Sequence, residues 1–109
     1  MANMTKAELR RTQLLTRECG CLACKQWGMY READLHHILS GGRRMGHSYA
    51  IPLCEWHHRG VSVNDMKGDE MLEMYGPSLA RDKRAFVDTF GSEIDLLALA
   101  DEWMQRAKR

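Results

Sequence analysis

The sequence predicts a small α+β domain, in which a short β-hairpin and the helix after it form a ββα unit packed by N- and C-terminal helices. Two short β-type segments, residues 33–39 and 50–54, enclose a glycine-rich loop, and residues 55–60 suit the start of a helix. All five histidines of the chain fall inside this unit. From residue 69 onward, apolar side chains recur at helical spacing.

Length and charge limit the class of protein. A chain of 109 residues forms one domain with a modest core, which favours stabilisation by a metal or a partner. The net charge of +1 excludes a strongly basic polymer-binding protein, so any nucleic-acid surface must be local. No apolar run approaches the ~20 residues of a membrane span, and residues 1–8 lack the apolar core of a secretory signal. We therefore expect a cytoplasmic protein without membrane contacts, in which reduced cysteines serve as metal ligands.

Residues 1–18 are expected to form a short helical leader, and residues 19–109 the domain itself. Thr5 can cap a helix, and Glu8, three positions later, completes a capping box. Leucines give the leader only a weak apolar stripe. Nothing in it suggests chemistry.

The cysteines supply two half-sites for one metal ion. A tight Cys-x-x-Cys motif precedes the hairpin, and a Cys-x-x-His motif follows it. Together they offer three thiolates and one imidazole, which favours a tetrahedral structural zinc site with the ligands Cys21, Cys24, Cys54 and His57. Cys19 is a spare thiol that could replace Cys21. A redox Cys-x-x-Cys is the alternative, but it needs a βαβ setting and a helix N-terminus, which residues 25–30 do not clearly provide.

Histidine pairs stand at both ends of the ββα unit. His36 and His37 are neighbours on the first strand, so their side chains face opposite ways. His57 and His58 are neighbours at the helix start and diverge by about 100° around the helix axis. One strand histidine and one helix histidine could hold a divalent ion, while the second strand histidine deprotonates water. This set suits phosphodiester hydrolysis, and the sequence holds no phosphate-binding loop, dinucleotide fingerprint or nucleophile motif.

The loop between the predicted strands suits a phosphate backbone. Its glycines permit close approach of the chain to a ligand. Arg43 and Arg44 stand between those glycines, where they are candidate phosphate contacts.

As a set, these motifs resemble the HNH (ββα-metal) nucleases. The motifs in question are Cys-x-x-Cys, His-His-Ile, Gly-Gly-Arg-Arg-Met-Gly-His, Ile-Pro-Leu-Cys-x-Trp-His-His-Arg-Gly, Gly-Pro-Ser-Leu-Ala and Phe-x-x-x-x-Gly. More closely, they resemble the bacteriophage recombination-enhancement (Ref) RecA-dependent nuclease family over roughly residues 19–99. The resemblance implies an HNH endonuclease that hydrolyses DNA in a bacterial host cell, with a RecA filament as a partner in phage recombination.

The resemblance also implies a role for each histidine. His36 would ligate the catalytic divalent ion, Mg²⁺ or Mn²⁺, and His37 would be the general base. His57 stands where these enzymes have a zinc-binding cysteine, and His58 would be a second ligand of the catalytic ion. The middle asparagine of the HNH motif has no counterpart. His47 is the neighbour with fitting chemistry, as a third ligand, a phosphate contact or a structural hydrogen bond.

Two further residues follow from the same comparison. Asp34 precedes His36 by two positions on the same strand face, so it could be a hydrogen-bond partner of that ligand. Arg59 joins Arg43 and Arg44 as an implied DNA contact. The alternative function is a non-catalytic, zinc-stabilised module that binds DNA or protein and retains a degenerate HNH unit.

Overall fold

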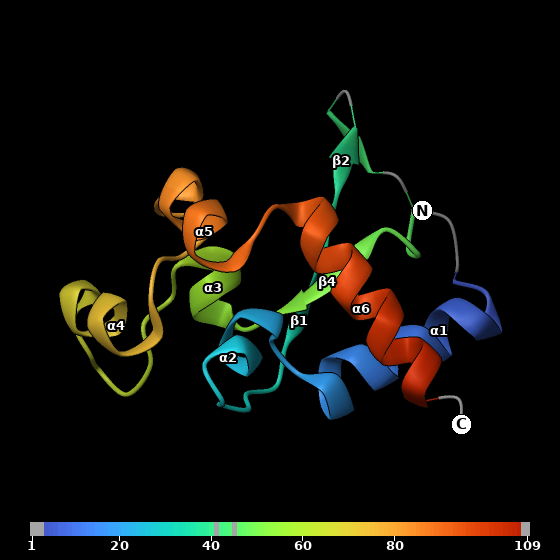
Figure 1. The fold of residues 1–109 in the computed structure, drawn as a ribbon, viewed down its shortest axis with the longest axis horizontal. Coiled ribbons are helices and arrows are strands. Elements are labelled where there is room, and N and C mark those ends of the chain that lie inside the picture. The colour runs from blue at the N-terminus through green and yellow to red at the C-terminus, as the bar shows by residue number, and fades with distance from the viewer. Residues whose placement is uncertain (1–3, 41, 45, 108–109) are drawn as a thin grey trace.

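The computed structural model describes residues 4–40, 42–44 and 46–107, with only the backbone given for Ser40 and Arg44. It confirms the predicted α+β class, with a central hairpin and helices from both ends of the chain around it (Figure 1). Of the described residues, no helix combines the length and apolar character needed to span a membrane.

The elements divide into helices and very short strands. The helical segments are α1 (Lys6–Gln13), the π-helical η1 (Leu14–Cys19), α2 (Leu22–Gln26), α3 (Glu55–Arg59), α4 (Gly68–Tyr75), α5 (Lys83–Phe90) and α6 (Glu93–Ala107). The strands are β1 (Asp34–His37), β2 (Leu39–Ser40), β3 (Arg43–Arg44) and β4 (Ala50–Leu53). They pair as two separate antiparallel sheets, β1 with β4 and β2 with β3.

The β1–β4 hairpin and α3 form the predicted ββα unit. In its register, His36 lies opposite Ile51 and His37 lies opposite Ala50. All of β4 is buried, as expected for its apolar side chains. α3 starts directly after Cys54 and ends at Gly60, whose φ of 72° is the left-handed cap that glycine favours. A Cβ at Gly60 would come within 2.7 Å of the Arg81 side chain, so this turn also needs the space.

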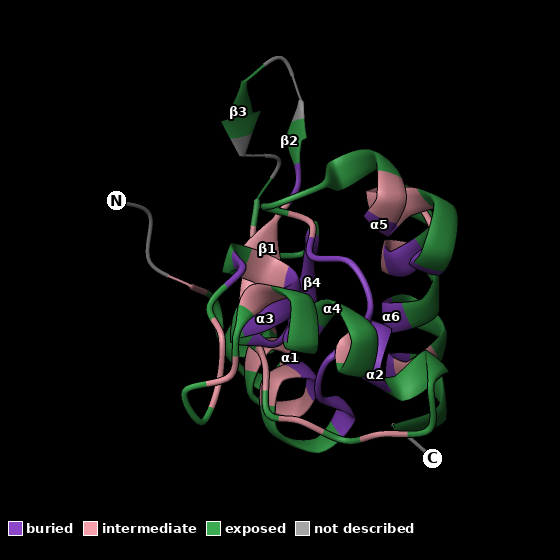
Figure 2. Ribbon diagram, turned by 90° about the vertical axis from the view of Figure 1, so that its left-hand side faces the viewer, coloured by how far each residue is buried: buried purple, intermediate pink, exposed green. Residues whose placement is uncertain are grey.

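The segment between the hairpin strands differs from the prediction. Residues 33–39 were expected as one strand and 40–49 as a loop. Instead β1 ends at His37, and β2 and β3 form a second ribbon that projects from the body (Figures 1 and 2). Strands of two residues carry no readable periodicity, which is why sequence pattern could not reveal them.

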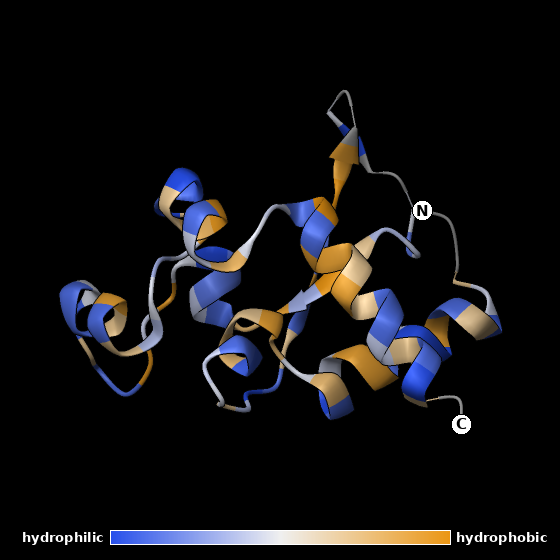
Figure 3. Ribbon diagram, viewed as in Figure 1, coloured by the Kyte–Doolittle hydropathy of each residue, from blue (hydrophilic) through white to orange (hydrophobic). Residues whose placement is uncertain are grey.

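The helices cover the hairpin with amphipathic faces. α6 and η1 lie against β4, and each longer helix carries both apolar and polar stretches (Figure 3). Leu15 in η1 is fully buried in the same core as Ile51 and Leu96, so the leader packs onto the domain. The boundary proposed at residue 18 stays a prediction.

Helix ends follow local hydrogen bonding. The predicted capping box is confirmed: Glu8 N–H donates to Thr5 Oγ1 at 3.1 Å, and Thr5 N–H donates to Glu8 Oε1 at 2.9 Å. α5 begins at Lys83, because the Asp82 carboxylate accepts from the Ala85 N–H at 3.1 Å and caps the helix there.

Candidate metal-dependent active site

The four residues predicted to bind zinc converge. α2 supplies Cys24 and is capped by Cys21, while Cys54 and His57 belong to the start of α3. Their ligand atoms all lie within 4.8 Å of one another, and all four side chains are buried. The helix after Cys21 is present, contrary to the sequence-based expectation for residues 25–30, but no βαβ setting surrounds it in the described chain.

The distances within this cluster suit tetrahedral zinc. Cys24 Sγ lies 3.9 Å from Cys54 Sγ, and His57 Nδ1 lies 3.2 Å from Cys54 Sγ and 3.4 Å from Cys21 Sγ. Around a zinc ion with ordinary bond lengths, neighbouring ligand atoms stand about 3.5–3.8 Å apart. The cluster is therefore compatible with a structural zinc site. Cys19 is buried but stands outside the cluster.

The orientation of His57 is fixed from its far side. His57 Nε2 lies 2.7 Å from the backbone oxygen of Tyr75. A carbonyl oxygen can only accept, so Nε2 carries the proton and Nδ1 points its lone pair at the sulfurs. Burial acts to lower the pKa of His57, but hydrogen bonds with Cys21 and Cys54 outweigh it and raise the pKa to about 9. Without a metal the cluster thus keeps a proton, which zinc would displace.

A second group of histidines lies on the other side of His57. His36 from β1 and His58 from α3 meet with ring centroids 5.1 Å apart and planes at 73°. The buried Nδ1 of His58 has no hydrogen-bond partner among the described residues. Burial, and next the proximity of His36, lower the pKa of His58. The neutral His58 ring, with its unpartnered Nδ1, and the neighbouring His36 ring form a donor set that fits a divalent metal.

His37 and His47 form a second contact beside this pair. His37 Nε2 lies 3.3 Å from His47 Nδ1, and the rings meet at 71°. Of the roles considered for His47, this distance supports a hydrogen bond to the predicted base. The alternation of β1 keeps His36 and His37 on opposite faces, as the sequence predicted.

The partner of His36 is a residue that sequence analysis missed. Glu93, at the start of α6, places Oε2 at 2.7 Å from His36 Nε2. Asp34, the predicted partner, instead forms an ion pair with Arg59 at 3.3 Å. Glu93 lies 57 positions after His36, and an acidic residue in the first turn of a helix is too common to signal a site. No pattern in the sequence could have identified it.

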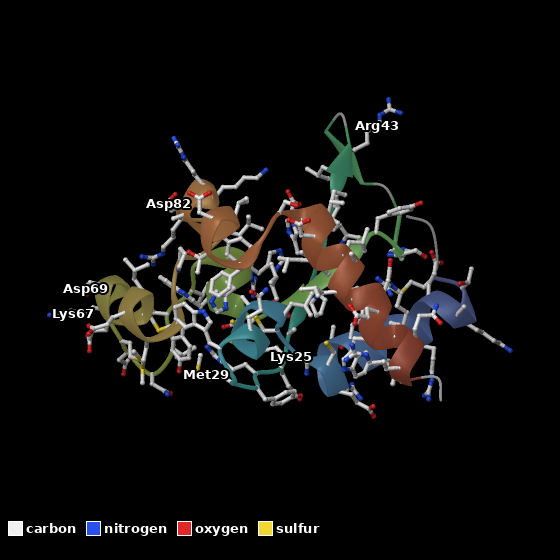
Figure 4. The ribbon with its side chains drawn as sticks, in the orientation of Figure 1. Lys25, Met29, Arg43, Lys67, Asp69 and Asp82 are labelled. Carbon is white, nitrogen blue, oxygen red and sulfur yellow. The ribbon has the colours of Figure 1, made fainter. Side chains whose placement is uncertain are left out.

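The predicted DNA contacts are spread over two elements. Arg43 is exposed at the far end of the β2–β3 ribbon and points away from the body (Figure 4). The Arg44 side chain lies outside the described residues. Arg59 is half-exposed at the end of α3, where Asp34 and Glu55 already hold its guanidinium at 3.3 and 3.4 Å.

A ββα unit that carries a buried Cys₃His cluster and a group of partly buried histidines defines a small protein with a candidate metal site. Comparison with protein families then gives the particular family. The model described as recombination enhancement, RecA-dependent nuclease matches residues 4–105, and the chain belongs to this family. The family description identifies a nuclease, and recombination as its setting. A search of curated protein sequences gives no match.

Proposed function

We propose that this chain is a metal-dependent endonuclease of the HNH class, which hydrolyses phosphodiester bonds of DNA in a RecA-dependent reaction. The observation that carries the proposal is the convergence of His36 and His58, whose ring centroids lie 5.1 Å apart; the next residue of β1, His37, contacts His47. Membership of a RecA-dependent nuclease family supports DNA as the substrate and RecA as the partner.

In the proposed site, His36 and His58 hold the divalent ion, and Cys21, Cys24, Cys54 and His57 hold a structural zinc. When bound, Mg²⁺ or Mn²⁺ stabilises negative charge on the phosphate and on the leaving oxygen. The neutral state favoured at His58 is the form that can donate to a cation.

His37 is the proposed general base. It accepts a proton from the attacking water, which becomes the nucleophile at phosphorus. The His47 ring, 3.3 Å away at its Nδ1, keeps the imidazole of His37 in place during this transfer. The attack breaks the P–O bond to the leaving oxygen on the opposite side of phosphorus; that oxygen takes a proton from solvent, and His37 later returns its own proton to solvent.

The test compares wild type with His37→Ala on supercoiled plasmid and on RecA-coated DNA, with Mg²⁺ or Mn²⁺. We expect the variant to lose cleavage by about 10²–10⁴-fold while it keeps its zinc content and circular dichroism. Glu102→Gln is the matched control, because this exposed glutamate of α6 pairs, among the described residues, with Arg106 alone. If a folded, zinc-loaded wild type cuts neither substrate with either ion, the nuclease proposal is wrong and the binding module takes its place.

The β2–β3 ribbon is the proposed backbone contact. An exposed arginine at the tip of a projecting ribbon can reach a phosphate without rearrangement of the body. Arg43→Ala should weaken DNA binding equally across sequences and reduce the salt slope by about 1. Arg106→Ala is the control, since Arg106 lies near the C-terminal end of α6, away from the ribbon (Figure 1). Equal salt slopes for the two variants would remove the ribbon from the interface.

A further inference from the structure

Glu93 brings a carboxylate from the C-terminal helix into the ββα unit. Its Oε2 lies 2.7 Å from His36 Nε2, and its Oε1 lies 3.4 Å from Lys83 Nζ at the start of α5. The Glu93 side chain is only 21% exposed, whereas that of Lys83 is 68% exposed. The His36–Glu93 contact is therefore mostly shielded from solvent, whereas Lys83 is exposed beside it.

The local structure holds this carboxylate in place. Ser92 caps α6 through reciprocal bonds with Asp95, each of 3.1 Å. α6 itself lies against β4, the strand that pairs with β1. The start of the helix is therefore fixed relative to His36, and Glu93 is the first residue of that helix.

The charge state of the pair determines the direction of the hydrogen bond. The Glu93 carboxylate lies between two nitrogen groups, with His36 Nε2 at 2.7 Å from its Oε2 and the Lys83 ammonium at 3.4 Å from its Oε1. An ionised carboxylate only accepts hydrogen bonds, so His36 must donate through Nε2–H. The lone pair of a neutral His36 ring then belongs to Nδ1.

The proposed zinc site shows the same arrangement. There, Nε2 of His57 lies 2.7 Å from the Tyr75 oxygen, and Nδ1 faces the three sulfurs. Both histidines are thus held at Nε2 at equal distance. The hydrogen-bond acceptor differs: it is a neutral backbone carbonyl for His57 and a carboxylate for His36.

We propose that Glu93 is the positioning residue of the active site, which holds Nε2–H of His36 and so assigns Nδ1 as the ligand atom for the divalent ion. This rests on the proposed function, because it gives His36 the role of metal ligand. A hollow of about 250 Å³ lined by His36, Leu39, Leu79, Lys83 and Glu93 leaves the pair accessible from outside. A carboxylate behind a ligating imidazole orients the ring and raises its basicity.

The experiment uses zinc-loaded protein and three variants: Glu93→Ala, Glu93→Gln and the control Glu102→Gln. Long-range ¹H–¹⁵N spectra, with His36→Ala to assign the ring, report which nitrogen carries the proton. We expect Nε2–H in wild type and in the control, and a mixture of tautomers in Glu93→Ala. Calorimetric titration with Mn²⁺ should show a Kd about 10–100-fold higher for Glu93→Ala. Glu93→Gln, whose amide oxygen can still accept, should recover part of that loss.

Two results would overturn the inference. One is an unchanged His36 tautomer together with an unchanged Mn²⁺ affinity in Glu93→Ala. The other is a Mg²⁺-dependent shift at His36 Nε2 instead of Nδ1. Neither measurement depends on cleavage, so the two proposals fail separately. If the wild type binds Mn²⁺ but cuts no DNA, the nuclease proposal is wrong, and the positioning role of Glu93 still stands.

Discussion

His57 and His58 are neighbours on α3, yet their surroundings differ. His57 is completely buried in a cluster of four ligand atoms. His58 is half-buried and faces a single partner ring, that of His36. Among the described residues, no second set of three ligand atoms converges as the cysteine cluster does. The closed set has the form of a structural site, while the pair that we propose for the divalent ion would leave positions for water and substrate.

The groups that hold His57 and His36, the two histidines proposed as metal ligands, also differ. A backbone carbonyl holds His57, and it can neither titrate nor change its charge. A side-chain carboxylate, shared with an exposed lysine, holds His36. The closed cluster is thus held by a neutral group, and the site proposed for the divalent ion by a charged one.

The largest effect should come from loss of the buried cluster. Cys24→Ser, or a strong chelator, should abolish the cooperative thermal transition. Structural zinc in small domains contributes about 10–16 kcal/mol, which matches or exceeds a typical total stability of about 5–15 kcal/mol. Circular dichroism and zinc content measure this. Cys19→Ser is the control for loss of a buried thiol, and it should keep one zinc per chain. Zinc loss in that variant instead would place Cys19 among the ligands.

Substitution of the two neighbours should separate the sites directly. His57→Ala should lose zinc and unfold, because it removes a ligand and leaves the Tyr75 oxygen without its donor. His58→Ala should keep zinc and fold and lose Mn²⁺ binding, with cleavage down by at least about 10²-fold. Metal analysis, melting curves and plasmid cleavage measure the three properties. Equal zinc loss in both variants would contradict the division into two sites.

A smaller effect is expected from pH. The pKa of His58 is lowered from 6.5 by burial, so the folded state binds fewer protons at this ring than the unfolded state does. Stability from this group is therefore fully present above about pH 6.5 and is lost as the pH falls through the lower, folded-state pKa. Mn²⁺ affinity should likewise persist below pH 6.5 before it falls. In His58→Ala, unfolding curves between pH 7 and pH 5 should lose this component. An affinity that halves at pH 6.5 would show an ordinary histidine.

The smallest effect concerns a region outside both sites. Thr5→Ala removes the capping box of α1 and should cost about 1 kcal/mol, with no change in zinc content or Mn²⁺ affinity. Chemical denaturation measures the difference. A change in Mn²⁺ affinity would show that the leader contributes to the active site as well as to stability.

The sequence predicted what local chemistry determines. The Cys-x-x-Cys and Cys-x-x-His spacings identified all four members of the buried cluster, and the Thr5–Glu8 spacing identified a capping box. The adjacent histidines could be assigned to different faces from strand and helix geometry alone. Each of these patterns is complete within a few residues.

What escaped prediction depends on long-range packing. Glu93 meets His36 only because α6 lies against β4, and nothing near residue 93 encodes that contact. Asp34 forms its ion pair with Arg59 and does not serve His36 as predicted. Sequence spacing cannot decide which of these two neighbours Asp34 contacts. The strands of the β2–β3 ribbon have two residues each. Such strands are too short to show the alternation of side chains by which a strand is predicted from sequence.

Two hydrogen bonds join α3 to the end of α4. Trp56 Nε1–H donates to the Gly76 oxygen at 2.8 Å, and His57 Nε2–H donates to the Tyr75 oxygen at 2.7 Å. Two successive residues of α3 thus hold two successive carbonyls at the end of α4. If the cluster loses its metal, these two hydrogen bonds should weaken. A protease should then cleave the Gly76–Pro77 segment before it cleaves the hairpin. The length of the first proteolytic fragment would then report whether the protein holds its metal.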